Sequence, residues 1–289
     1  MNSSATNIDT SNRSSLVGSL TGLLKPRYYV LTNRYPKHEG QDDEGIRGMV
    51  INPKSLEKDA NGMKQWLGRL EPTPNVRWYY DKQGREAHSK AVLKTLETPR
   101  HHPTFIYIAG HTEPQTTAVP PLAYAPADYL EYQDGKPQLV SYETMRGLLL
   151  KNDHSAPLIF ITEVCFCENF LQLPYALECK GNEARWVPTG YPSISTINSS
   201  DIVHFAATSP GERALSFASG AVFTKAFYNI NPSVAGSLKN IMEQLQGNVN
   251  TILSSEGSNR SARWSQHPKV YASRIIDDPH FFAALGFHQ

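Results

Sequence analysis

The chain has 289 residues, of which 39% are apolar, and it carries 28 Lys plus Arg against 27 Asp plus Glu. This length and apolar content suit one large globular domain and exclude a disordered or fibrous protein. The charge is nearly balanced and scattered along the chain, so we expect no basic face and no nucleic-acid partner. No run approaches the roughly 18 apolar residues that a membrane span requires, so we expect no membrane partner either.

The N-terminal segment 1–24 is rich in Ser, Thr and Asn. It lacks the basic start, the apolar centre and the cleavage site of a secretory signal. We therefore expect a flexible polar tail at 1–24, followed by a single domain at 25–289, in a cytoplasmic protein.

The three cysteines are Cys165, Cys167 and Cys179. An odd number of cysteines, with two of them one residue apart, is poor material for a disulfide framework. A zinc site is a weak alternative, because no histidine accompanies these cysteines at short spacing. We expect free thiols in a reducing compartment.

Hydrophobic periodicity and turn residues predict strands that alternate with helices. In chain order we expect a strand at 28–31, a polar loop at 33–45, a helix at 55–70, a strand at 76–80, a helix at 86–96, a strand at 104–110, a helix at 142–150, strands at 157–164 and 202–207, and helices at 220–227 and 234–253.

This alternation predicts an α/β fold, a three-layer sandwich around a mostly parallel sheet. The continuous apolar runs at 104–110 and 157–164 suit strands that are buried on both faces. Segment 183–200 contains Pro, Gly, Ser and Asn and is expected to be an exposed loop. It would divide the domain into a larger part, 25–182, and a smaller part, 201–289.

A histidine and a cysteine directly follow the two strongest strand candidates, namely His111 after 104–110 and Cys165 after 157–164. Because ligands bind at the carboxyl ends of parallel strands, these two side chains would share one edge of the sheet. An imidazole activates a thiol by removing its proton. A loop histidine and a small buried cysteine are the ordinary readings of the same residues, and the spacing alone leaves both readings open.

Several short segments resemble, in the same order, the motifs of caspase-like cysteine peptidases, and those of metacaspases most closely. FIYIAGH resembles their Y-Y-S-G-H segment, ITEVCFC their D-x-C-x-S segment and LQLPY their L-D-L-P-Y run. Further on, FAATSPGE resembles A-A-S-S-P-G-Q, GAVFTKAF resembles G-x-F-T-x-A-F, and QHP matches Q-x-P. The resemblance covers residues 28–287 and implies the caspase-haemoglobinase-like form of the α/β/α sandwich.

The resemblance implies that His111 is the general base and that Cys165 is the nucleophile of a cysteine endopeptidase. The backbone N–H groups of Cys165 and Thr112 would hold the oxyanion. Thr112 stands where the family has Gly, and its β-branched side chain restricts the backbone there. The motif of arginines with which animal caspases bind Asp is not evident at 210–217.

The implied substrate-binding residues are Glu163, Asn52 and Ala109. Glu163 lies two residues before the nucleophile, where metacaspases have an acid that binds Arg or Lys before the cleaved bond. Asn52 aligns weakly with a second acid and lacks its charge, and Ala109 replaces a Ser. The resemblance thus implies cleavage after Arg or Lys, with one carboxylate rather than two.

The resemblance also implies protein or peptide substrates and a monomeric enzyme. It implies no required cofactor or metal, with calcium activation as an option, and cleavage after Lys180 or Arg185 as a maturation step. Cys167 reads as a small buried residue or as a resolving thiol for an oxidised Cys165. Two other functions stay open: a caspase-like regulatory or binding protein with little or no turnover, and a different thiol enzyme on the same architecture.

Overall fold

The computed structural model describes most of the chain from residue 25 onward. The described residues are 25–33, 35, 53–70, 73–80, 86–114, 122–131, 137–192, 200–256 and 264–287. The tail expected at 1–24, most of the polar loop expected at 33–45, and Asn52 lie outside these residues.

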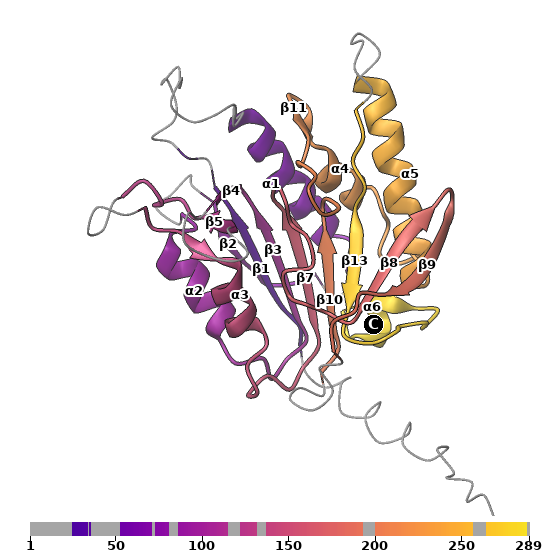
Figure 1. Ribbon diagram of the computed structural model, residues 1–289, viewed down its shortest axis with the longest axis horizontal. Helices are drawn as coiled ribbons and strands as arrows, with labels where there is room; N and C mark the ends of the chain where they lie inside the picture. The colour runs from indigo at the N-terminus through magenta and orange to yellow at the C-terminus, as the bar shows by residue number, and fades with distance from the viewer. Residues whose placement is uncertain are drawn as a thin grey trace, which may run out of the picture.

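An eight-stranded sheet forms the centre of the fold (Figure 1). Its spatial order is β2 (Val76–Tyr79), β1 (Arg27–Thr32), β3 (Thr104–Ala109), β7 (Leu158–Glu163), β10 (Ile202–Ala206), β13 (Lys269–Ala272), β8 (Tyr175–Lys180) and β9 (Glu183–Pro188). The first five strands in this order pair in parallel, and the last three each pair antiparallel with the strand before them.

Helices cover both faces of the sheet (Figure 1). The first group is α1 (Pro53–Leu67), α4 (Val222–Tyr228), α5 (Leu238–Glu256) and the short α6 (Phe281–Ala284), and the second is α2 (Ser89–Glu97) and α3 (Tyr142–Leu149). On the first face, the Trp66 ring of α1 lies 5.6 Å from Phe105 of β3 and 5.1 Å from Phe227 of α4. On the other face, Leu96 of α2 and Ile106 of β3 line the same small cavity between helix and sheet. The expected three-layer α/β sandwich with a mostly parallel sheet is confirmed.

Two small sheets accompany the main one. The first contains β4 (His111–Pro114), β5 (Leu122–Ala125) and β6 (Val140–Ser141), and the second contains β11 (Ser216–Phe217) and β12 (Gly220–Ala221). Because β12 takes the first two residues of the helix expected at 220–227, that helix, α4, begins at Val222.

The segment expected to be a loop at 183–200 is a strand over its first six residues, so this expectation was wrong for 183–188. These residues form β9, which pairs along its whole length with β8. Ala184 is buried, and its N–H donates to Glu243 of α5. Tertiary packing against α5 therefore outweighs the Pro- and Gly-rich composition on which the expectation rested.

Candidate active site

The topology brings His111 and Cys165 to the same edge of the sheet. Strands β3 and β7 are parallel neighbours, and Ala109 stands opposite Glu163 in their register. The N–H of Gly110 donates to the carbonyl of Glu163 at 3.2 Å, which extends the pairing beyond both strands. His111 and Cys165 each follow this pair by two residues, so both emerge where the two strands end.

Gly110 makes the turn that leads from β3 into β4. A Cβ at this position would stand 2.5 Å from the hydroxyl of Tyr35 and 3.1 Å from the ring of Tyr124. The same Tyr35 hydroxyl accepts the N–H of His111 at 2.8 Å and donates to the carbonyl of Ala125 at 2.7 Å. The backbone of His111 is therefore held by a buried tyrosine that only a glycine can approach this closely.

The imidazole of His111 is paired with a carboxylate that the sequence reasoning missed. Nε2 of His111 lies 2.7 Å from Oε1 of Glu113, and the two side chains are 10% and 28% exposed. Both residues lie on β4, where side chains two residues apart point to the same face. The sequence does contain a signal for this pair, because a His and a Glu two residues apart share one face of a strand. The signal could be used only if 111–114 were known to be a strand.

Cys165 is partly buried, in the turn after β7. Its Sγ lies 4.0 Å from the carbonyl oxygen of Ala214. Burial raises the pKa of the Cys165 thiol, while the contact with Ala214 and the charge of Arg213 act in the opposite direction. A raised pKa favours the protonated thiol, so a base would have to remove its proton before this sulfur could act as a nucleophile.

The residue after Cys165 has an unusual backbone. Phe166 adopts a left-handed conformation with φ of +55°, and its N–H donates to the carbonyl of Glu212 at 3.0 Å. This conformation costs roughly 1 kcal/mol for a residue other than glycine. The hydrogen bond to the loop at 209–215 helps to hold the sharp turn that presents the cysteine.

Cys167 lies in the core. It is 0% exposed, and its Sγ contacts the carbonyl of Thr162 at 3.6 Å and the hydroxyl of Thr208 at 3.4 Å. These contacts are those of a small buried side chain, the first of the two readings given to Cys167.

Thr112 and Cys165, the two residues assigned to the oxyanion, are linked through Tyr142. The hydroxyl of Tyr142 donates to the carbonyl of Cys165 at 3.3 Å and lies 3.0 Å from the hydroxyl of Thr112. Since the Tyr142 proton goes to Cys165, the Thr112 hydroxyl is the donor in the second bond. The β-branched side chain at Thr112 is thus built into a contact between β4, α3 and the turn that carries Cys165.

Glu163 is almost fully enclosed, with 5% exposure. Its Oε2 accepts the N–H and the hydroxyl of Thr224, both at 2.8 Å. Its Oε1 has no hydrogen-bond partner among the described residues. Burial, followed by the nearby charge of Asp59, raises the pKa of Glu163 to about 8.

Asp59 is a second buried acid close to Glu163, and the sequence reasoning did not single it out. Its carboxylate accepts the N–H of Ala221 at 2.9 Å, and burial raises its pKa to about 7. The sequence signal for Asp59 was an acidic residue on the apolar face of helix α1. Asp59 lies on the same face as the buried Met63 and Trp66. Of the other assigned substrate residues, Ala109 is buried at the end of β3 and its carbonyl accepts the hydroxyl of Tyr124.

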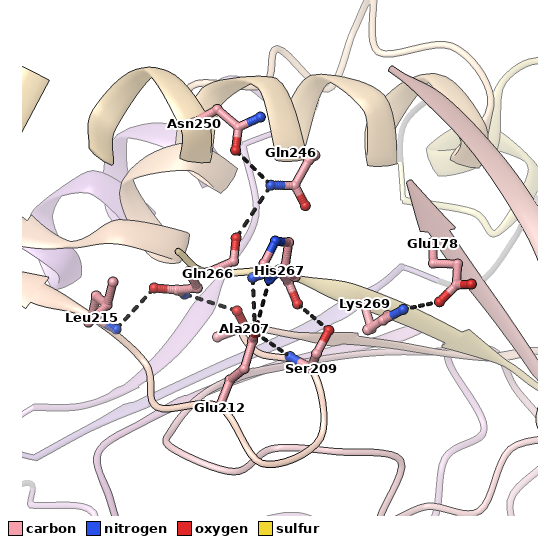
Figure 2. A network of polar contacts seen from close by, with 10 residues as sticks. All are labelled: Glu178, Ala207, Ser209, Glu212, Leu215, Gln246, Asn250, Gln266, His267 and Lys269. Carbon is pink, nitrogen blue, oxygen red and sulfur yellow. Dashed lines mark hydrogen bonds and ion pairs between the residues drawn. The ribbon is translucent and has the colours of Figure 1, made fainter. Parts of the chain in front are cut away.

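The loop at 209–215, whose Ala214 carbonyl contacts Cys165, is fastened by a polar network. Figure 2 shows this network. The Glu212 carboxylate accepts the N–H of Ser209 and the N–H of His267, and it contacts Nδ1 of His267 at 2.6 Å. Gln266 accepts the N–H of Leu215 at 3.0 Å and donates to the carbonyl of Ala207 at 2.9 Å. The segment QHP, noted in the sequence, thus anchors the loop that contacts Cys165.

Within the described ranges, no group of three His, Cys, Asp or Glu side chains could hold a metal ion. Likewise, no helix in the described part of the chain has the length and apolar character needed to cross a membrane.

Comparison with known proteins supports the fold and goes no further. No protein-family model matches the sequence, and no curated protein matches it. Among solved structures, the fold is similar to that of caspase-1 from Spodoptera frugiperda, with a TM-score of 0.53 over 88% of this chain and 90% of that chain. The two sequences are 10% identical. The chain therefore has a caspase-like fold, and the likeness does not distinguish a metacaspase from other members of that fold.

Proposed function

We propose that this protein is a cysteine endopeptidase in which His111 activates Cys165. The observation that carries the proposal is the position of the two residues, each two residues beyond the paired ends of β3 and β7 in a caspase-like fold. Residues at the carboxyl ends of neighbouring parallel strands are well placed to act on one substrate.

The reaction would proceed through a covalent intermediate. His111 removes the thiol proton of Cys165, and the sulfur attacks the carbonyl carbon of the scissile peptide bond. The backbone N–H groups of Cys165 and Thr112 would stabilise the oxyanion. His111 then gives the proton to the leaving amine, and a thioester remains. His111 next takes a proton from water, the hydroxide attacks the thioester, and the proton returns to the Cys165 sulfur as the acid product leaves.

Glu113 has a natural place in this reaction as a positioning residue. When the N–H at Nε2 of His111 is donated to Glu113, Nδ1 is the ring atom that accepts the thiol proton. The negative charge of Glu113 also stabilises the imidazolium that forms during attack. Glu113 would therefore orient His111 without touching the substrate.

For specificity, we propose cleavage after Arg or Lys, recognised by Glu163. Its Oε1 has no partner in the described part of the chain, so it can accept a hydrogen bond from a cationic side chain. Asp59 supplies the second acid that Asn52 does not. Because the pKa of Glu163 is raised to about 8, its affinity for a cation is expected to increase as the pH rises toward that value.

The alternative is a caspase-like regulatory protein that binds partners and turns over slowly or not at all. Two observations favour it. The pKa of the Cys165 thiol is raised by burial, and Glu163 is almost closed off from solvent. A substrate must open a path to Glu163 if it is to bind there.

The first test is cleavage of fluorogenic peptides that end in Arg, Lys or Asp, with and without calcium. We expect the wild type to cleave after Arg and Lys. Cys165→Ala should abolish cleavage, whereas Cys167→Ala, which removes the neighbouring thiol, should retain it. A folded wild-type protein that cleaves none of these peptides would support the regulatory alternative. Equal losses in both cysteine variants would contradict the assignment of the nucleophile.

We also propose that the protein is a monomer. The β8–β9 hairpin covers β13, and the outermost strand β9 carries Glu183, Arg185 and Pro188. Charged residues and proline at a sheet edge oppose pairing with a second edge. Sedimentation velocity should show a single species of the 32.2 kDa chain mass, and a concentration-dependent dimer would contradict the proposal.

A further inference from the structure

A small cavity lies far from the candidate active site, at the opposite ends of the same strands. Its volume is about 10 Å³, and it lies between α2 and the sheet. Arg27 and Thr104, the first residues of β1 and β3, line it. His111 and Cys165, by contrast, lie beyond the last residues of their strands.

A buried arginine lines this cavity and is only partly satisfied. Arg100 is 3% exposed, and its Nη1 donates to the carbonyl of Leu149 at 2.8 Å. Its Nε and Nη2 have no hydrogen-bond partner among the residues that the structure describes. Two nitrogen atoms of a planar guanidinium, which together carry three N–H donors, are thus held inside the protein.

The backbone of Arg100 keeps the side chain in place. Its N–H donates to Nδ1 of His154 at 3.1 Å, and its carbonyl accepts the N–H groups of Ser155 and Ala156. Since Nδ1 of His154 accepts a proton and its Nε2 contacts the carbonyl of Leu148, this imidazole is neutral. The histidine therefore adds no charge beside Arg100, and the backbone from which the guanidinium extends is held on both sides.

The lining of the cavity does not neutralise the charge of Arg100. It contains two arginines and three threonines and no carboxylate. The threonine hydroxyls each donate to a nearby backbone carbonyl. The side-chain donors that remain available to a bound ligand are therefore the guanidinium N–H groups. Asp153 acts on Arg100 from outside, and its side chain is 52% exposed. Burial lowers the pKa of Arg100 to about 9, so the side chain remains a cation at neutral pH.

We propose that this cavity binds one monovalent anion of chloride size, held by Nε and Nη2 of Arg100. A buried cation is costly unless an opposite charge or a full set of acceptors meets it. A cavity of about 10 Å³ holds one particle of roughly the size of a water molecule, so it excludes phosphate and sulfate. Because the site forms only in the folded chain, the anion would stabilise the fold without entering the reaction.

The decisive experiment is crystallographic. Crystals of the full chain, grown without halide and soaked in sodium bromide, should show an anomalous difference peak within hydrogen-bond distance of Nε and Nη2 of Arg100. A water molecule at that position, with no anomalous signal, would overturn the proposal.

Thermal unfolding supplies a second, independent readout. At equal ionic strength, sodium chloride should raise the Tm of the wild type by roughly 3 °C over sodium gluconate, whose anion is too large for the cavity. Arg100→Met should remove this chloride-specific increment. Arg185→Met is the control, because Arg185 is exposed on β9 and does not line the cavity. An equal increment in wild type and Arg100→Met would contradict the site. If Arg100→Met does not fold, the bromide experiment on the wild type decides.

Discussion

Oε1 of Glu113 lies 2.7 Å from Nε2 of His111, on the same face of the same short strand. Cys165 follows the adjoining strand β7, so the pair lies at the same edge of the sheet as this thiol. The carboxylate is 28% exposed, so its effect on the imidazole is moderated but not abolished by solvent.

The role of Glu113 predicts a specific pH signature, provided that the protein is a peptidase. Glu113→Gln keeps a hydrogen-bond acceptor but removes the negative charge. We expect kcat/KM to fall about 10-fold, and the limb of the pH profile governed by the imidazole to move to lower pH by about one unit. Glu97→Gln, at an exposed acid in α2, is the control. A lower rate with an unmoved limb would mean that Glu113 supports the structure only.

Gly110 should be irreplaceable for activity. In Gly110→Ala the new Cβ would meet the Tyr35 hydroxyl at 2.5 Å, so either the tyrosine or the backbone of His111 must move. We expect kcat/KM to fall about 100-fold, because small displacements of a catalytic group are this costly. Gly147→Ala is the matched control, since a Cβ there meets nothing within 4 Å. Adding Tyr35→Phe should recover part of the activity lost in Gly110→Ala. Full activity in Gly110→Ala would contradict the assignment of His111.

Glu163 should make the protein less stable at alkaline pH. Its pKa is raised from 4.5 to about 8, so the carboxyl is protonated in the folded state and ionised in the unfolded state between these values. The stability that it contributes is complete below pH 4.5 and is lost as the pH rises through 8. When the pH is raised from 6 to 9, we expect the free energy of unfolding to fall by about 2 kcal/mol more in the wild type than in Glu163→Gln. Urea unfolding at both pH values measures this difference, with Glu143→Gln as an exposed control. Equal losses in wild type and Glu163→Gln would show that Glu163 is ionised in the folded protein.

The sequence allowed prediction of the features that depend on local pattern. Continuous apolar runs identified β3 and β7, and the rule that parallel strands end at one edge then placed His111 and Cys165 at the same edge of the sheet. The alternation of strands and helices sufficed for the three-layer architecture. These inferences needed no knowledge of which side chains meet across the fold.

What could not be predicted depends on contacts between distant segments. Asp59 becomes part of the site because α1 packs against α4, which brings it to the N–H of Ala221. Glu113 pairs with His111 because the chain continues as a strand after the turn at Gly110. Strand β9 forms because β8 and α5 receive it, although its neighbourhood is rich in turn residues.

His204 should govern part of the stability in acid. It is 0% exposed on β10, its Nε2 bonds the hydroxyl of Thr162 at 2.9 Å, and burial lowers its pKa from 6.5 to about 3. Its ring lies between Phe160 and Tyr271, at 5.2 Å and 5.9 Å, and among the described residues its Nδ1 has no hydrogen-bond partner. The folded state thus keeps His204 neutral while the unfolded chain binds a proton below pH 6.5. Stability is therefore lost as the pH falls from 6.5 toward 3.

Substitution of His204 separates this titration from general acid denaturation. The variant His204→Gln keeps a polar partner for Thr162 and cannot titrate. When the pH is lowered from 6.5 to 4.5, the free energy of unfolding should fall by about 2 kcal/mol more in the wild type than in this variant. His280→Gln is the control, because that residue is exposed and outside the core. Guanidinium unfolding at the two pH values gives the comparison. If His204→Gln loses as much stability in acid as the wild type, the imidazole is protonated in the folded state, and the aromatic pocket must open to admit a counter-charge.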